Sequence, residues 1–129
     1  MATTEITSSN FASTIRSGGT VLIDWWAPWC APCRAFGPIY ERIAAQHPDL
    51  TFGKVNTENE PELAAQFEIQ AIPTLMVIRD GTLLFSQAGM VPQAALEDLI
   101  QQVQALDMEE VRRTVAATKS GASASTASA

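Results

Sequence analysis

The 129-residue sequence has few histidines and cysteines, the usual ligands of structural zinc sites, and few positively charged residues. It contains one histidine, two cysteines and 8 Lys and Arg residues against 14 Asp and Glu residues, for a net charge of −6. A surface for nucleic acid or for anionic lipid is therefore not expected. No apolar run approaches the ~18 residues of a membrane span, and the opening MATTEITSSN has neither a basic residue nor an apolar stretch. We therefore expect no secretion signal, no membrane partner and a cytoplasmic location.

Both cysteines lie in the most distinctive stretch of the sequence, residues 21–34. It reads VLIDWWAPWCAPCR, with one acid, Asp24, in an apolar run that is followed by both cysteines. We predict a buried strand over residues 20–26 and a helix over residues 35–46, so that the strand delivers two thiols to the start of the helix. The unpaired N–H groups and the dipole of a helix stabilise a thiolate there.

Cys30 and Cys33 are three residues apart, which places them on one face of a helix, within reach of disulfide distance. Pro32 is tolerated in the first turn, because the N–H that it lacks would have no helical partner. A zinc site needs four ligands, and the cysteines with the distant His47 supply three at most unless two chains share the site. A purely structural disulfide is disfavoured where thiols are kept reduced. We therefore predict a reversible dithiol–disulfide pair and no metal.

The remaining sequence predicts one α/β domain. Strand, helix, strand and helix alternate over residues 20–67, a pattern typical of parallel pairing. The Asp80-Gly81 pair between two apolar segments predicts an antiparallel hairpin. With an edge strand near the N-terminus, we expect a mixed sheet of four or five strands flanked by helices on both faces. A helix is expected over residues 92–106, and Asp107 can cap a further helix.

Together these motifs resemble the thioredoxin family over about residues 6–106. A lone C-x-x-C would be weak, but W-C-x-P-C after a strand with an acid, followed about 40 residues later by Ile-Pro-Thr, is specific. The resemblance implies the thioredoxin fold for residues 1–106. The remaining residues extend past the usual end of the family: the Asp107 cap predicts a helical extension over residues 107–118, and the small, polar residues 119–129 predict a disordered tail. The residues that carry it are Asp24, Trp26 to Arg34, Lys54, Ile72-Pro73-Thr74, Asp80-Gly81 and Gly89.

By this resemblance the protein is a disulfide reductase in which Cys30 attacks and Cys33 resolves. Asp24 corresponds to a buried acid that serves proton transfer to Cys33, and Lys54 corresponds to the neighbour of that acid. Pro73 corresponds to a cis-proline whose adjoining backbone pairs with the substrate. The implied substrate-binding surface comprises Trp29, Ala31, Pro32, Ile72, Pro73 and Gly89.

The resemblance also implies protein substrates with disulfide bonds, re-reduction by an NADPH-dependent flavoprotein reductase, and no cofactor bound to this chain, which we expect to be a monomer. Ala31 stands where the family usually has glycine, which affects the redox potential rather than the reaction. Trp25 and Asn56 replace a more common Phe and Asp. Two other functions stay open. One is a disulfide oxidase or isomerase, whose members typically carry His between the cysteines and are exported. The other is a redox-coupled binding subunit that uses the C-terminal extension.

Overall fold

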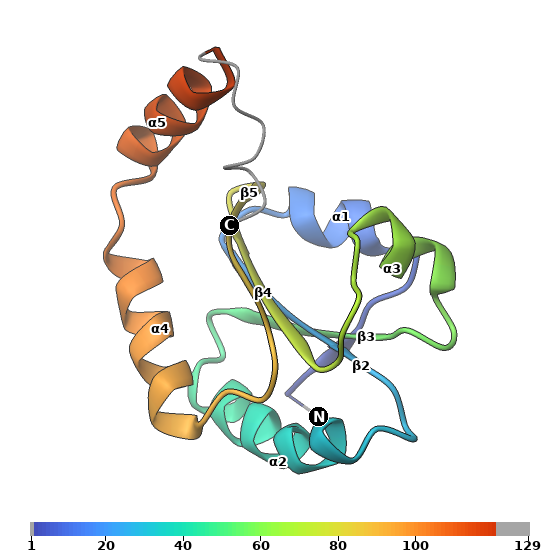
Figure 1. Cartoon of the computed structure of the whole chain (residues 1–129). Coiled ribbons are helices and arrows are strands. Elements are labelled where there is room, and N and C mark those ends of the chain that lie inside the picture. The colour runs from blue at the N-terminus through green and yellow to red at the C-terminus, as the bar shows by residue number, and fades with distance from the viewer. Residues whose placement is uncertain (1, 121–129) are drawn as a thin grey trace.

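The computed structural model describes residues 2–120, and their side chains as far as residue 114. A five-stranded mixed sheet in the order β1-β3-β2-β4-β5 separates two pairs of helices (Figure 1). This arrangement confirms the predicted α/β architecture with helices on both faces. The strands are β1 (Thr4–Glu5), β2 (Thr20–Trp26), β3 (Thr51–Asn56), β4 (Thr74–Arg79) and β5 (Thr82–Ala88). The helices are α1 (Phe11–Arg16), α2 (Ala31–Gln46), α3 (Pro61–Gln66), α4 (Gln93–Ala105) and α5 (Met108–Ser120).

The central strand β2 pairs in parallel with β3 on one side and antiparallel with β4 on the other. The predicted hairpin joins β4 to β5, which pair antiparallel. Asp80 and Gly81 at its tip have φ angles of 52° and 80°, and such positive values at both central positions match the right-handed twist of the two strands. β1 adds a short parallel edge next to β3, as the sequence predicted.

Both faces of β2 are covered. Leu22 belongs to an apolar cluster with residues of α2 and α4, whereas Ile23 belongs to a second cluster with residues of α1 and α3. Because side chains alternate along a strand, Asp24 and Trp26 lie on the same face as Leu22. That face is covered by α2, which begins directly after the loop that follows β2. The fold therefore places the single acid of the strand beneath the helix that carries the cysteines.

The helix α2 starts at Ala31, four residues before the range predicted for it, and this start agrees with the predicted place of Pro32 in the first turn. Cys30 acts as its N-cap, in an extended conformation with φ −88° and ψ 113°. The Cys30 sulfur accepts the backbone N–H of Cys33 at 3.3 Å. A sulfur atom here replaces the oxygen of the usual Ser, Thr, Asp or Asn cap.

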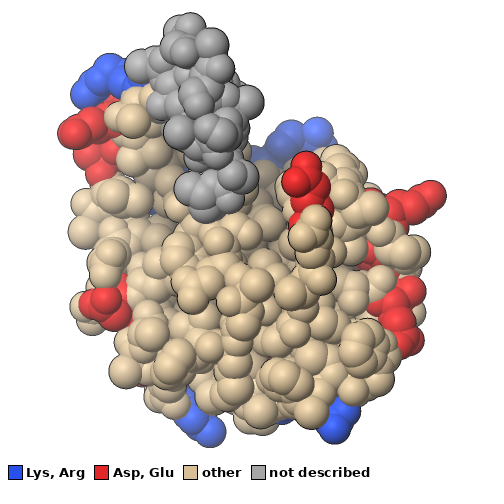
Figure 2. All heavy atoms as spheres, in the orientation of Figure 1, with Lys and Arg blue, Asp and Glu red and all other residues tan. Residues whose placement is uncertain are grey.

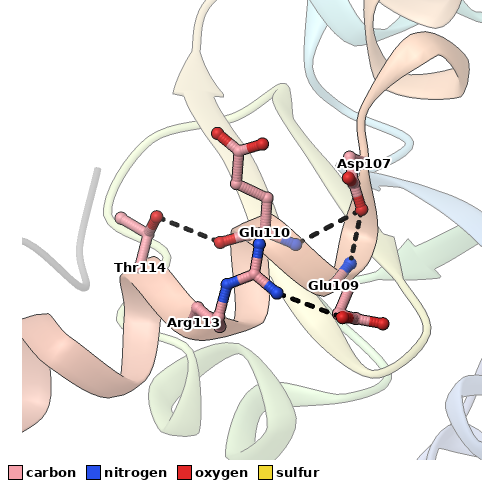
Figure 3. Close-up of polar contacts among 5 residues, drawn as sticks. All are labelled: Asp107, Glu109, Glu110, Arg113 and Thr114. Carbon is pink, nitrogen blue, oxygen red and sulfur yellow. Dashed lines mark hydrogen bonds and ion pairs between the residues drawn. The ribbon is translucent and has the colours of Figure 1, made fainter.

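The C-terminal helix α5 begins with the acidic cap that the sequence predicted (Figure 3). Asp107 Oδ1 accepts the backbone N–H groups of Glu109 at 3.0 Å and Glu110 at 3.3 Å. α5 lies at one end of the molecule, beyond α4 (Figure 1), and continues to Ser120, so that it includes the first two residues of the predicted tail. The rest of that predicted tail, residues 121–129, lies outside the described residues. None of the helices within residues 2–120 has the length and apolar character needed to cross a membrane.

Arg79, the last residue of β4, binds the carbonyl oxygens at the C-terminal end of α4. Its Nη1 donates to Val103 O at 2.7 Å, to Gln104 O at 3.4 Å and to Leu106 O at 3.3 Å. Carbonyl groups at the C-terminal end of a helix carry partial negative charge, and of these three Val103 O also accepts the N–H of the C-cap Leu106 at 3.2 Å. Arg79 therefore joins the sheet to the end of α4.

We predict that Arg79→Met lowers the free energy of unfolding by about 1–2 kcal/mol, because hydrogen bonds from a charged donor contribute ~1.5–3 kcal/mol and this donor is only half-buried. Urea unfolding followed by tryptophan fluorescence measures the change. Arg112→Met removes an exposed guanidinium from α5 and serves as the control, with an expected change below ~0.5 kcal/mol. Equal stability of Arg79→Met and wild type would contradict the capping role.

Candidate active site

Cys30 and Cys33 form a disulfide at the N-terminus of α2, with their Cα atoms 5.2 Å apart. The two residues are almost covered, at 5% and 2% exposure. Cys30 precedes the first turn, where free N–H groups and the helix dipole favour negative charge. When the disulfide is reduced, these groups stabilise the Cys30 thiolate and increase its reactivity at neutral pH.

The loop between α3 and β4 lies against this disulfide. Its Ile72–Pro73 peptide bond is cis, as the resemblance implied, and the Ile72 carbonyl oxygen lies 3.8 Å from the Cys30 sulfur. The Pro73 carbonyl accepts the N–H of Gly89 at 2.8 Å. Gly89 has φ +103°, a conformation that L side chains rarely adopt. The structure therefore brings together three of the predicted binding residues and Cys30.

The exposed side chains around the disulfide are mainly apolar, although the guanidinium of the exposed Arg34 donates to the Pro28 carbonyl at 3.0 Å. Trp29 is 64% exposed, and Met90, directly after Gly89, is 44% exposed. Ala31 and Pro32 are exposed at the start of α2. In Figure 2 the charged side chains lie mainly around the rim of the visible face, and its lower centre is uncharged. Met90 was not predicted, and its one signal in the sequence is a large apolar residue next to a loop glycine.

Asp24 lies behind this surface, on the face of β2 that α2 covers. It is fully buried, and neither carboxylate oxygen has a hydrogen-bond partner within residues 2–120. Lys54 is its neighbour in the β2–β3 register. Burial raises the pKa of Asp24 to about 7, although the positive charge of Lys54 offsets part of this effect. Asp24 can therefore take up or release a proton near neutral pH, as a general acid–base group must.

Two further residues near the acid were missed in the sequence. Trp26, two positions after Asp24 on the same face, has its indole ring centroid 4.6 Å from the Lys54 ammonium. Tyr40 of α2 donates its hydroxyl to the Gly53 carbonyl at 2.8 Å. Burial raises the pKa of Tyr40 well above its ordinary value, and the negative charge of Asp24 adds to the shift. The period-two alternation of β2 indicates that Trp26 faces α2, but no pattern in the sequence pairs it with Lys54.

Within the described residues, no group of three or more His, Cys, Asp or Glu side chains is placed to hold a metal ion. Three features therefore define the chemistry of the site. They are a cysteine pair at a helix N-terminus, a mainly apolar surface with exposed backbone beside it, and a buried carboxyl group with a pKa of about 7 behind it. A thiolate at such a surface can attack a disulfide of another protein, and the second thiol can resolve the resulting mixed disulfide. These features define a thiol–disulfide oxidoreductase.

Known proteins are similar to this chain in sequence and in fold. The sequence model of the thioredoxin family matches residues 2–102. A Streptomyces coelicolor protein whose name assigns it to the thioredoxins is 53% identical over 115 residues, covering 89% of this chain and 86% of that protein. The thioredoxin of Alicyclobacillus acidocaldarius is 38% identical over 103 residues, covering 79% and 98%. The oxidised mitochondrial thioredoxin 3 of Saccharomyces cerevisiae has a TM-score of 0.71 at 29% identity, covering 78% and 95%.

The chain belongs to the thioredoxin family. Its sheet and helices form the thioredoxin fold, and the protein is a thiol–disulfide oxidoreductase that reduces disulfide bonds through its active-site dithiol. The sequence-based predictions of fold class, family and reaction are confirmed.

The buried acid gives a prediction about stability and pH. The folded-state pKa of Asp24, about 7, lies above its ordinary value of 3.8. The neutral carboxyl therefore contributes its full stability below the unfolded-state pKa, and this contribution is lost as the pH rises through about 7. We predict that oxidised Asp24→Asn becomes more stable than wild type as the pH rises from 4 to 7, by up to about 1 kcal/mol per pH unit, with a plateau above pH 7.

Urea unfolding of both oxidised proteins at pH 5, 6, 7 and 8 measures this difference. Asp49→Asn, at an exposed position, is the matched control and should follow wild type at every pH. A difference between Asp24→Asn and wild type that does not vary with pH would show that the carboxyl at position 24 does not titrate as described.

Proposed function

We propose that Cys30 is the nucleophile and Cys33 the resolving cysteine. The Cys30 thiolate attacks one sulfur of a partner disulfide, and the other partner sulfur leaves as a thiolate that takes up a proton. Cys33 then loses its proton and attacks the Cys30 sulfur, which releases the second partner thiolate and forms the Cys30–Cys33 disulfide. Two electrons pass from the dithiol to the partner. The position of Cys30 as N-cap, before the first turn of α2, is the observation that carries this assignment.

The second step needs a group that accepts the Cys33 proton, and we assign that role to Asp24. Cys33 lies in the first turn of α2, on the helix that covers the Asp24 face of β2, and is 2% exposed, so bulk water has little access to its thiol. At neutral pH an acid with a pKa of about 7 is ionised in a large fraction of molecules. Lys54 stabilises the ionised form and so sets the pH at which Asp24 becomes competent.

The partner chain binds, in this proposal, across the mainly apolar surface beside the disulfide. The Ile72 carbonyl and the Pro73–Gly89 contact present backbone next to Cys30, where an extended partner chain can lie alongside. The exposed Trp29 side chain, with Ala31 and Pro32, supplies apolar contact at the other side of the sulfur. Glycine at position 89 leaves this backbone open to close approach.

We assign the protein to the cytoplasm, as a monomer that keeps protein thiols reduced and passes on electrons from NADPH through a flavoprotein reductase. The oxidised dithiol must be reduced again after each cycle, and proteins of this family share that requirement. We take residues 1–106 as the catalytic domain and residues 107–118 as an extension, because the family match ends at residue 102 and α4 ends at Ala105.

We predict that Cys33→Ser traps a mixed disulfide with a disulfide-containing peptide. The serine hydroxyl cannot attack the Cys30 sulfur, so the first step occurs and the second does not. Mass spectrometry should show a one-to-one adduct on Cys30 that a small thiol releases. Cys30→Ser is the matched control and should give at least ~10-fold less adduct at pH 7, because a thiol inside the helix is a weaker nucleophile than one at its N-terminus. More adduct on Cys33 than on Cys30 would reverse the two roles.

A further inference from the structure

The side chain of Trp26 contacts both functional parts of the site. It is half-buried at the end of β2 and packs against the cluster of Ala27, Cys30 and Cys33. Its indole face also lies over the Lys54 ammonium, 4.6 Å from the ring centroid. An indole ring attracts a cation placed over its face, and it does so more strongly than the ring of Phe or Tyr.

We propose that Trp26 is a positioning residue whose indole face holds the Lys54 ammonium beside Asp24. The proposal rests on the proposed role of Asp24 as proton acceptor for Cys33. In this proposal Trp26 contacts neither the transferred proton nor the substrate. It holds the Lys54 ammonium, whose positive charge stabilises the Asp24 carboxylate.

The surrounding backbone leaves a defined space for this ammonium. Asp24 and Lys54 are paired in the β2–β3 register, and Trp26 lies on the same face, nearer the cysteines. α2 passes over them, and a Cβ atom at Gly37 would lie 4.0 Å from the Lys54 Nζ. The ammonium therefore lies between the helix backbone and the indole ring.

No carboxylate holds Lys54 in this place. Neither Asp24 oxygen accepts a hydrogen bond within residues 2–120, and Lys54 forms no salt bridge there. Glu41 of α2 is near enough to feel the lysine charge, but its carboxylate accepts hydrogen bonds from the backbone N–H groups of Ala2 and Thr3, at 2.8 and 3.3 Å, and from the Thr3 hydroxyl, at 2.8 Å. The contact with Trp26 is therefore what fixes the ammonium.

Few titratable groups of the described residues act on Asp24. β3 contributes Lys54, and α2 contributes the Tyr40 phenol, while the β4 residue opposite Asp24 is the apolar Leu75. Lys54 is the one cation in this set. If the indole is removed, the long lysine side chain can move toward solvent, where its attraction for the Asp24 carboxylate is weaker. The pKa of Asp24 should then rise.

The test follows the Asp24 carboxyl by carbon-13 NMR during a pH titration of the oxidised protein, in which neither cysteine titrates. We expect Trp26→Leu to raise the pKa of Asp24 by ~0.5 or more, because an opposite charge within ~4–6 Å lowers a carboxyl pKa by ~1–3. Trp26→Phe should give a smaller rise, and it also decides the question if Trp26→Leu does not fold. Trp29→Leu, which changes an exposed indole, is the matched control and should leave the pKa of Asp24 unchanged.

The same Trp26 substitutions in a Lys54→Met protein show whether Trp26 acts by positioning the lysine or by changing the burial of Asp24. Lys54→Met should raise the pKa of Asp24 by itself, and adding Trp26→Leu or Trp26→Phe to it should produce no further rise. An unchanged pKa in both single Trp26 variants, or an equal rise with and without Lys54, would overturn the proposal. The proposed function fails in a different way. In that case the pKa of Asp24 moves in these variants, but the pH dependence of mixed-disulfide resolution does not move with it.

Discussion

The burial of Asp24 between β2 and α2, without a hydrogen-bond partner in residues 2–120, is the constraint on which the chemistry of this site depends. A charged carboxylate in such a place costs free energy, and the protein lowers this cost by binding the proton up to about pH 7. Lys54 supplies the opposing charge across the β2–β3 ladder. A solvent-exposed carboxyl group would be ionised throughout the neutral range. Its pKa would be so low that the group would accept a thiol proton inefficiently.

The fold separates this acid from the surface at which we propose that partners bind. The acid lies beneath α2, whereas the cysteines lie at the first turn of the same helix, next to the Ile72–Pro73 loop and the exposed Trp29. Partner binding and proton transfer can therefore use opposite sides of the dithiol. This arrangement requires the loop after β2 to be short, because the end of the strand must lead directly into the N-cap of α2.

Sequence patterns predicted the features that depend on local rules. The apolar run around Asp24 predicted the buried strand β2, and Asp80-Gly81 predicted the hairpin. The place of Pro32 in the first turn of α2 was predicted, but the capping hydrogen bond to the Cys30 sulfur was not, because cysteine lies outside the usual set of capping residues. The contact between Trp26 and Lys54 could not be predicted, because it depends on the β2–β3 register and on the space at Gly37. The exposure of Met90 likewise depends on how the loop after β5 lies against the Pro73 loop.

The most direct test of this account is the rate at which Cys33 resolves a preformed Cys30–peptide mixed disulfide, measured by rapid quench between pH 5 and 9. If Asp24 accepts the Cys33 proton, the wild-type rate rises with a midpoint near pH 7, the pKa of the buried acid. Asp24→Asn should lack this midpoint, retain only the rise at higher pH where a thiol ionises by itself, and be at least ~10-fold slower at pH 7. Superimposable pH profiles for the two proteins would contradict the central claim.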